Sequence, residues 1–216
     1  MPIVKKDKKL SEDKPTLVNF ILDESGSMHG FRTQTISGFN EYVNSLKAEA
    51  KNKVEMTLTQ FQSNNVNIVY SNKNICRVPE LTDETYKPYD MTPLYDAIGN
   101  TITKTESKKN IEKYSVLFVI MTDGVENSSQ EYTRESIFKM IEEKKKQGWV
   151  FTFLGANQDS YAEGMKMGIR HTMDFDQILT AKAMHKAASS TMTFMSRAST
   201  GKIYTKNENF FDDKKY

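Results

Sequence analysis

Tyr114–Met121 has the sequence YSVLFVIM, the most continuously apolar run in the chain. Such runs are typical of strands that are covered on both faces of a parallel sheet. Two shorter runs, Thr16–Leu22 (TLVNFIL) and Trp149–Leu154 (WVFTFL), have the same buried-strand character. We therefore expect Tyr114–Met121 to form the centre of a parallel sheet, with the other two runs as further strands.

Amphipathic helices are predicted between these strands, because apolar residues recur there at steps of three and four. The three stripes are Ile36, Phe39, Val43 and Leu46; then Leu94, Ile98 and Ile102 after Pro93 as the first helical residue; then Ile137, Met140 and Ile141. The alternation of strand and helix predicts an α/β fold of Rossmann-like type. In it, a doubly wound, mostly parallel central sheet carries helices on both faces.

One part of the sheet is predicted to be antiparallel. Residues 54–58 and 66–70 alternate between apolar and polar, and turn-forming residues separate them. We expect a hairpin whose second strand is an antiparallel edge strand. The segment Ser71–Met91 that follows has no clear period, and we expect a loop of about twenty residues, a length that usually accompanies function or disorder.

The sequence indicates one domain, residues 15–199, between a charged N-terminal tail (1–14) and a polar C-terminal tail (200–216). Near its end we expect a helix at 158–167, a short edge strand at 171–175 and a long final helix. The packed face of that helix is predicted to consist of Ile178, Ala181, His185, Ala188, Met192 and Met195.

Composition excludes several classes of function. The 216 residues include 30 Lys plus Arg and 28 Asp plus Glu, so the net charge of +2 argues against bulk electrostatic binding to nucleic acid or a membrane surface. The single cysteine, Cys76, cannot form an internal disulfide, and the three histidines have no zinc-site spacing. No apolar run is long enough for a signal peptide or a membrane span. We expect a soluble, cytoplasmic protein.

Acidic and hydroxyl side chains follow the ends of two predicted strands. Asp23, Ser25 and Ser27 follow the first strand, and Asp123 follows the central strand. In a doubly wound sheet these two strands become neighbours at the switch point where such folds bind ligands. Thr92, in the long loop, offers one more hydroxyl. Carboxylates and hydroxyls are ligands for Mg²⁺ or Mn²⁺ rather than for zinc or copper.

These residues resemble the von Willebrand factor A (VWA) domain with its metal-ion-dependent adhesion site (MIDAS). The family's D-x-S-x-S element resembles Asp23, Ser25 and Ser27 of this chain. Its threonine element resembles Thr92, and its final acid resembles Asp123. The likeness covers residues 15–198. Met91 is a departure, because many members of the family have glycine before the threonine.

The resemblance implies a role for each residue. Ser25, Ser27 and Thr92 would be hydroxyl ligands of Mg²⁺ or Mn²⁺, and Asp23 and Asp123 would act partly through water. A partner protein would complete the coordination with an Asp or Glu carboxylate. Stand-alone prokaryotic or phage domains of this type resemble adaptors, and by that analogy we expect a metal-dependent protein-interaction module and no enzyme. The oligomeric state is not predicted.

Two other functions remain open at this point. A haloacid-dehalogenase-like phosphohydrolase also has Asp after its first strand, but it needs a second acid two residues later, where this chain has Ser25. The second open function is that of a VWA scaffold that binds no metal. Several neighbouring residues either select the partner or form a solvated loop: Glu24, Met28, His29, Phe31, Glu126, Asn127 and Ser128.

Overall fold

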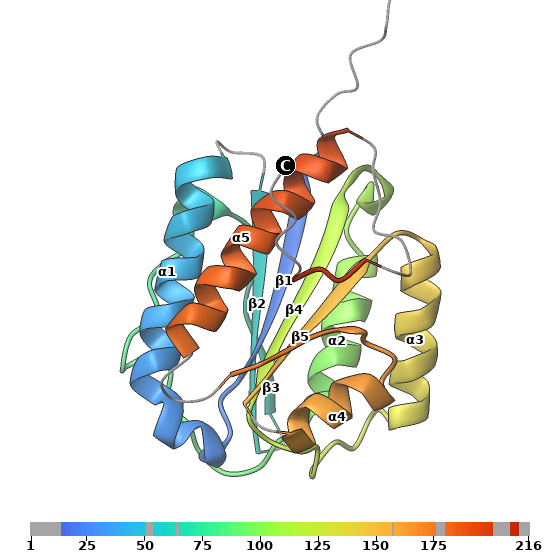
Figure 1. Ribbon diagram of the computed structural model, residues 1–216. Coiled ribbons are helices and arrows are strands. Elements are labelled where there is room, and N and C mark those ends of the chain that lie inside the picture. Colours follow the sequence, from blue (N-terminus) through green and yellow to red (C-terminus); the bar gives the residue numbers. More distant parts are fainter. Residues whose placement is uncertain are drawn as a thin grey trace, which may run out of the picture.

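The strands form one twisted sheet. A computed structural model describes residues 14–50, 54–63, 65–156, 158–175, 180–200 and 208–211. The strand order within these residues is β3-β2-β1-β4-β5-β6 (Figure 1). The strands are β1 (Thr16–Asp23), β2 (Val54–Gln62), β3 (Asn65–Asn74), β4 (Ser115–Thr122), β5 (Val150–Gly155) and β6 (His171–Asp174).

The sheet confirms the predicted doubly wound topology. All neighbouring strands are parallel except β2 and β3, so β3 is the predicted antiparallel edge strand. β1 and β4 pair directly, from Thr16 opposite Ser115 to Leu22 opposite Met121. Their carboxyl ends are therefore neighbours, which is the geometry that the site prediction required.

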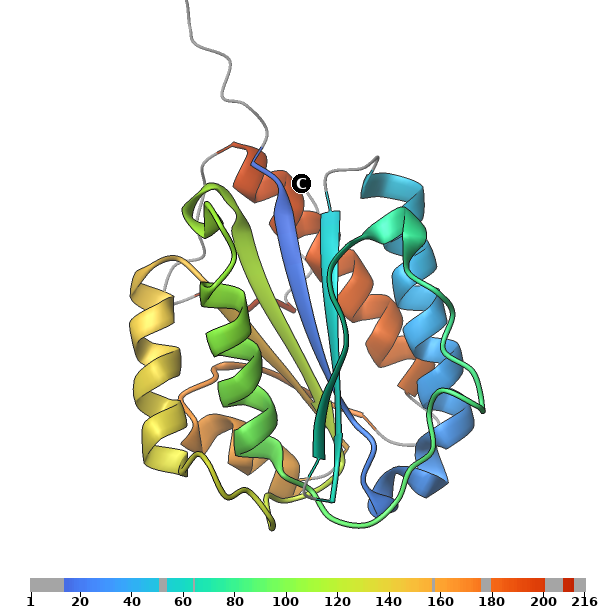
Figure 2. The ribbon, with the colours of Figure 1, turned by 180° about the vertical axis from the view of Figure 1, so that it is seen from behind.

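Helices cover both faces of the sheet, as expected. α1 (Arg32–Ala50) and α5 (Thr180–Ser199) lie on one face, and α2 (Leu94–Glu106) and α3 (Arg134–Lys146) lie on the other (Figures 1 and 2). Gly164 of α4 (Gln158–Lys166) packs on Phe153, whose apolar cluster includes residues of α2 and α3.

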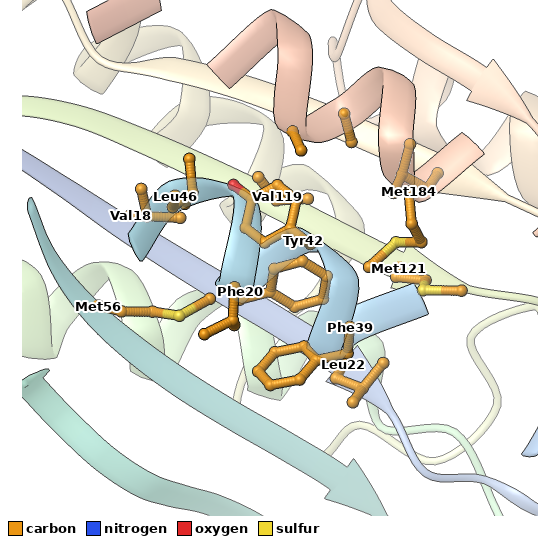
Figure 3. Close-up of a cluster of buried hydrophobic side chains, with 14 of the residues drawn as sticks. Val18, Phe20, Leu22, Phe39, Tyr42, Leu46, Met56, Val119, Met121 and Met184 are labelled. Carbon is orange, nitrogen blue, oxygen red and sulfur yellow. The ribbon is translucent and has the colours of Figure 1, made fainter. Parts of the chain in front are cut away.

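The central strands are largely apolar because both of their faces are buried. Leu117, Val119 and Met121 of β4 pack in the cluster with α1 and α5, whereas Val116, Phe118 and Ile120 pack in the cluster with α2 and α3. In the first cluster the ring of Phe20 from β1 meets those of Phe39 and Tyr42 from α1 edge-on, at centroid distances of 5.2 and 5.4 Å (Figure 3).

Three local predictions are wrong. The predicted loop at 71–91 begins later, because β3 continues to Asn74 and a 3₁₀ turn follows at Ile75–Arg77. The last residues of β3, 71–74, are all polar, so they do not show the alternation of apolar and polar residues that predicts a strand. Pro93 is not the first helical residue but precedes α2, which begins at Leu94.

The third error concerns part of the packed face of α5: Ala188 is buried, and Met192 and Met195 are partly buried against the same cluster, as predicted, but the first turns of the helix differ. Ala181 and His185 are exposed, and Ile178 lies outside the described residues. The buried side chains are Thr180, Ala183, Met184, Ala187, Ala188, Ser190, Thr191 and Phe194. The predicted stripe missed the apolar residues Ala183, Met184, Ala187 and Phe194 as well as the buried threonines. One of these threonines, Thr191, shares a 3.0 Å hydrogen bond with the Tyr42 hydroxyl.

The predicted polar C-terminal tail, residues 200–216, includes two buried aromatic side chains. Phe210 and Phe211 belong to the α1–α5 cluster, and the Phe210 N–H donates to His171 Nδ1 at 3.1 Å. Nearby, Arg197 Nη2 donates to both carboxylate oxygens of Glu208, at 2.8 and 2.9 Å. Residues 1–13 lie outside the described residues. No helix in the described ranges is long and apolar enough to cross a membrane.

Candidate metal centre at the carboxyl edge of the sheet

The five predicted site residues lie on three loops at the carboxyl ends of β1 and β4. Asp23 is the last residue of β1, and Asp123 follows β4 directly. Asp23 and Ser25 have no exposed surface, and Thr92 and Asp123 are buried at 3% and 7% exposure. Ser27 is exposed. The site is therefore a buried set of oxygen atoms with one serine at the surface.

Asp23 is held by hydrogen bonds to both of its carboxylate oxygens. The Ser25 N–H donates to Oδ1 at 2.7 Å, and the Thr122 hydroxyl donates to Oδ2. Burial raises the pKa of Asp23 from 3.8 to about 7; the hydrogen bonds from Thr122 and Ser25 oppose this shift, and nearby Asp123 adds to it. Sequence reasoning missed Thr122, although it directly precedes Asp123.

A chain of hydroxyl contacts connects the loop after β1 with the loop after β4, and the Thr92 hydroxyl lies beside it. Ser25 Oγ and Ser27 Oγ are 3.1 Å apart, and Ser27 Oγ donates to Asp123 Oδ1 at 2.7 Å. A Cβ atom on Gly124 would lie 3.1 Å from Thr92 Oγ1 and 3.4 Å from Ser27 Oγ. All five predicted residues thus converge. Gly124 allows this convergence, since a side chain there would crowd both hydroxyls.

The β1 loop is fastened to the long loop that carries Thr92. Glu24 accepts the Lys87 N–H at its carboxylate and the Tyr89 N–H at its backbone carbonyl, the latter at 2.9 Å. The Gly26 N–H donates to the Asp90 carbonyl at 2.9 Å, and a Cβ at Gly26 would lie 3.2 Å from Asp90 backbone atoms. Glu24 is therefore a structural brace, and glycine at 26 permits the close approach of the two loops.

Thr92 is braced by the loop that follows β4. Asn127 Oδ1 accepts the Thr92 N–H at 2.7 Å, and the Asn127 N–H donates to the Thr92 carbonyl at 3.2 Å. Glu126 accepts the backbone N–H groups of Tyr95, Ser128 and Ser129. Sequence analysis left open whether these residues are a solvated loop; their hydrogen bonds show that they position the threonine loop.

Ser63, in the turn between β2 and β3, joins both of these loops. Its N–H donates to the Met91 carbonyl at 2.9 Å and its hydroxyl to Asp90 Oδ2 at 2.8 Å. The Ser128 hydroxyl donates to the Ser63 carbonyl at 3.1 Å. Ser63 and Asp90 both have left-handed backbones, with φ of 54° and 63°. Nothing in the sequence beyond a turn signal pointed to Ser63.

The donor set fits a hard divalent cation. It consists of two carboxylates and three hydroxyls, the oxygen ligands that Mg²⁺ and Mn²⁺ accept. Within the described residues no lysine, arginine or histidine forms an ion pair with Asp23. Nor do three or more His, Cys, Asp or Glu side chains gather anywhere in that part of the chain as a metal cluster. Buried carboxylate charge favours a bound cation.

This α/β domain, with buried oxygen atoms gathered at its switch point, belongs to a defined family. The sequence profile of the von Willebrand factor type A domain matches residues 18–200, and the chain therefore belongs to that family. Domains of this family are usually protein-interaction or adhesion modules. No curated protein matches the chain by sequence at a significant level.

Solved structures share the fold at low sequence identity. The von Willebrand factor domain of the type V pili tip protein Mfa5 from Porphyromonas gingivalis has a TM-score of 0.65 and 10% identity, over 84% of this chain and 96% of that one. The manganese-loaded TRAP protein of Plasmodium vivax has a TM-score of 0.54 and 18% identity, over 82% of this chain and 74% of that one. The pilus adhesin SpaC from Lactobacillus rhamnosus GG, in its open conformation, has a TM-score of 0.60 and 12% identity. The match covers 83% of this chain but only 30% of SpaC.

Proposed function

We propose that this chain is a divalent-metal-dependent protein-interaction module, in which Asp23, Ser25, Ser27, Thr92 and Asp123 form a MIDAS. The observation that carries the proposal is the chain of oxygen contacts from Ser25 through Ser27 to Asp123, with Thr92 beside it. Single serine or aspartate residues after strands are ordinary turn formers. Five such residues from three loops, converging at one edge, favour a common ligand.

The chain's own residues have distinct tasks in this proposal. Ser25, Ser27 and Thr92 supply neutral hydroxyls, and Asp23 and Asp123 supply charge, partly through water. A bound Mg²⁺ or Mn²⁺ would provide an electrophilic position for an Asp or Glu carboxylate of the partner. Ser27 is the exposed member of the set and borders the face that a partner reaches.

The enzyme alternative is disfavoured by the surroundings of Asp23. A phosphohydrolase nucleophile needs a carboxylate oxygen that can reach its substrate. Both oxygens of Asp23 accept protein hydrogen bonds, and the side chain has no exposed surface. Position 25 also lacks the acid that would protonate a leaving group. We therefore propose a binding module rather than an enzyme.

Calorimetric titration with Mn²⁺ and Mg²⁺ tests the metal site directly. We expect the wild type to bind, and Thr92→Val to weaken binding by roughly tenfold or more because it removes one hydroxyl ligand. Thr101→Val is the matched control: it removes a buried threonine hydroxyl from α2, where the partners are Thr59 and the Ala97 carbonyl. Negligible heat with the wild type, or equal affinities for the two variants, would contradict the proposal and favour a metal-free scaffold.

Turnover of a generic aryl phosphate tests the enzyme alternative. We expect no hydrolysis above that of the Asp23→Asn variant. Hydrolysis by the wild type that Asp23→Asn abolishes would reverse the ranking of the two functions.

A further inference from the structure

Large apolar side chains are exposed around the candidate metal centre. Six such side chains are exposed among the described residues, and three of them border the site: Tyr89 at 70%, Met91 at 44% and Val125 at 47%. Tyr89 and Met91 flank Asp90 just before Thr92, and Val125 follows Gly124 directly. We call Tyr89, Met91 and Val125 the apolar rim.

The backbone of the apolar rim is held in place. The Tyr89 N–H donates to the Glu24 carbonyl at 2.9 Å, and the Met91 carbonyl accepts the Ser63 N–H at 2.9 Å. Val125 lies between Gly124, which packs on Thr92, and Glu126, which accepts three backbone N–H groups. Because the backbone is fixed, these side chains are presented to solvent at defined positions and need little ordering when a partner binds.

The charges beside the rim do not select a strongly charged partner. Lys87 and Asp90 are exposed on the same loop and have opposite signs, and the Asp90 carboxylate accepts the Ser63 hydroxyl. A nucleic acid would require a cluster of basic side chains here. Tyr and Met are enriched at protein interfaces, and exposed apolar side chains next to a ligand site indicate a binding surface.

We propose that the apolar rim and the metal centre together bind a protein segment in which an Asp or Glu is flanked by large apolar side chains. The inference rests on the proposed function, which provides the position for the carboxylate. The rim provides the sequence selectivity, because Tyr89, Met91 and Val125 contact the apolar side chains beside the acid. An acid flanked only by polar residues leaves the rim exposed and binds more weakly.

Random peptides displayed on phage, captured in Mg²⁺ and eluted with EDTA, test the specificity. We expect the eluted sequences to contain Asp or Glu with Leu, Ile, Met, Phe, Tyr or Trp within two positions. Synthetic copies of the enriched peptides are then titrated against purified variants by fluorescence anisotropy. Met91→Gln and Val125→Thr should each weaken peptide binding by roughly fivefold or more.

The chain offers matched controls. Met165→Gln on α4 and Val69→Thr on β3 make the same chemical changes at similar exposures of 46% and 43%, and should leave peptide affinity unchanged. Mn²⁺ affinity should be unchanged in all four variants, since none of them is a proposed ligand.

Three results would overturn the inference. The first is that the Asp or Glu of the eluted peptides is flanked by polar or basic residues. The second is that a protein that binds Mn²⁺ enriches no peptides in a metal-dependent way. The third is that the rim variants bind the peptides with the same affinity as the control variants. Failure of the wild type to bind Mn²⁺ at all would instead overturn the proposed function, so the two failures are distinguishable.

Discussion

Asp23 combines full burial with a carboxylate that the fold keeps close to a second acid. Burial raises its pKa from 3.8 to about 7, and Asp123 contributes to the shift. The metal-free folded protein therefore binds a proton more tightly than the unfolded chain does. This stabilisation is complete below the unfolded pKa of 3.8 and is lost as the pH rises through about 7.

Thermal unfolding in EDTA at several pH values measures this linkage. Between about pH 5 and about pH 8, we expect the wild type to lose stability relative to Asp23→Asn, by an amount of order a few kcal/mol. Asn keeps the acceptor for the Ser25 N–H, and the Thr122 hydroxyl can turn to the Gly124 carbonyl, 3.3 Å away. Parallel pH profiles for the two proteins would contradict the raised pKa.

A substitution at Ser63 can change the geometry of the site with little effect on the stability of the protein. Its φ of 54° is a conformation that glycine adopts without strain, so Ser63→Gly should leave the free energy of unfolding within about 1 kcal/mol of wild type. The variant loses the hydroxyl that donates to Asp90, two residues before Thr92. We therefore expect weaker Mn²⁺ binding by titration calorimetry, without loss of stability.

Asn72→Gly is the matched control for this variant. Asn72 also has a left-handed backbone, with φ of 52°, and its side chain donates to Ser71 on β3 rather than to a site loop. Its Mn²⁺ affinity should equal that of the wild type. Equal affinities for Ser63→Gly and Asn72→Gly would show that Ser63 does not position the threonine loop.

At the scale of elements, α5 packs closely on α1 at a position where α1 has a glycine. A Cβ on Gly38 would lie 2.8 Å from Met184 Cγ and 3.2 Å from Met184 Cβ. Figure 3 shows Met184 beside the α1 residues of the same cluster. The crossing of these two helices therefore depends on the absence of a side chain at position 38.

Gly38→Ala tests this packing because two effects have opposite signs. Helix propensity alone would stabilise the variant by about 1 kcal/mol. We expect overpacking against Met184 to dominate and to destabilise it by roughly 1–3 kcal/mol in urea unfolding. Met184→Ala should cost less in the Gly38→Ala background than in the wild type. A Gly38→Ala variant as stable as wild type would contradict the close contact.

Strands were easier to predict than helix faces. The central strands are apolar on both faces, so their pattern needs no knowledge of orientation. The buried face of α5 depends on which side meets α1, and it includes Thr180 and Thr191, whose hydroxyls can bond within the fold. An apolar period alone does not identify the threonine and serine positions of that face.

At the scale of the whole molecule, the topology brings distant residues together. The Thr122 hydroxyl and Asp23 are 99 positions apart in the chain, and Ser27 and Asp123 are 96 apart. The direct pairing of β1 with β4 accounts for both contacts. Phe210 and Phe211, near the C-terminal end, likewise pack in a cluster with residues far earlier in the chain.

The sequence by itself predicted that the first and central strands are neighbours, that one edge strand is antiparallel, and that Asp23, Ser25, Ser27, Thr92 and Asp123 gather at one edge. These predictions follow from local patterns and from the rule that parallel strands end at one edge. Only the tertiary structure decided how the loops are held: Thr122, Ser63 and Asn127 act through hydrogen bonds to partners distant in the chain. Such partners are fixed by the packing of loops and have no periodic signal. The same reason explains why the exposed rim around the site became visible only once the chain was folded.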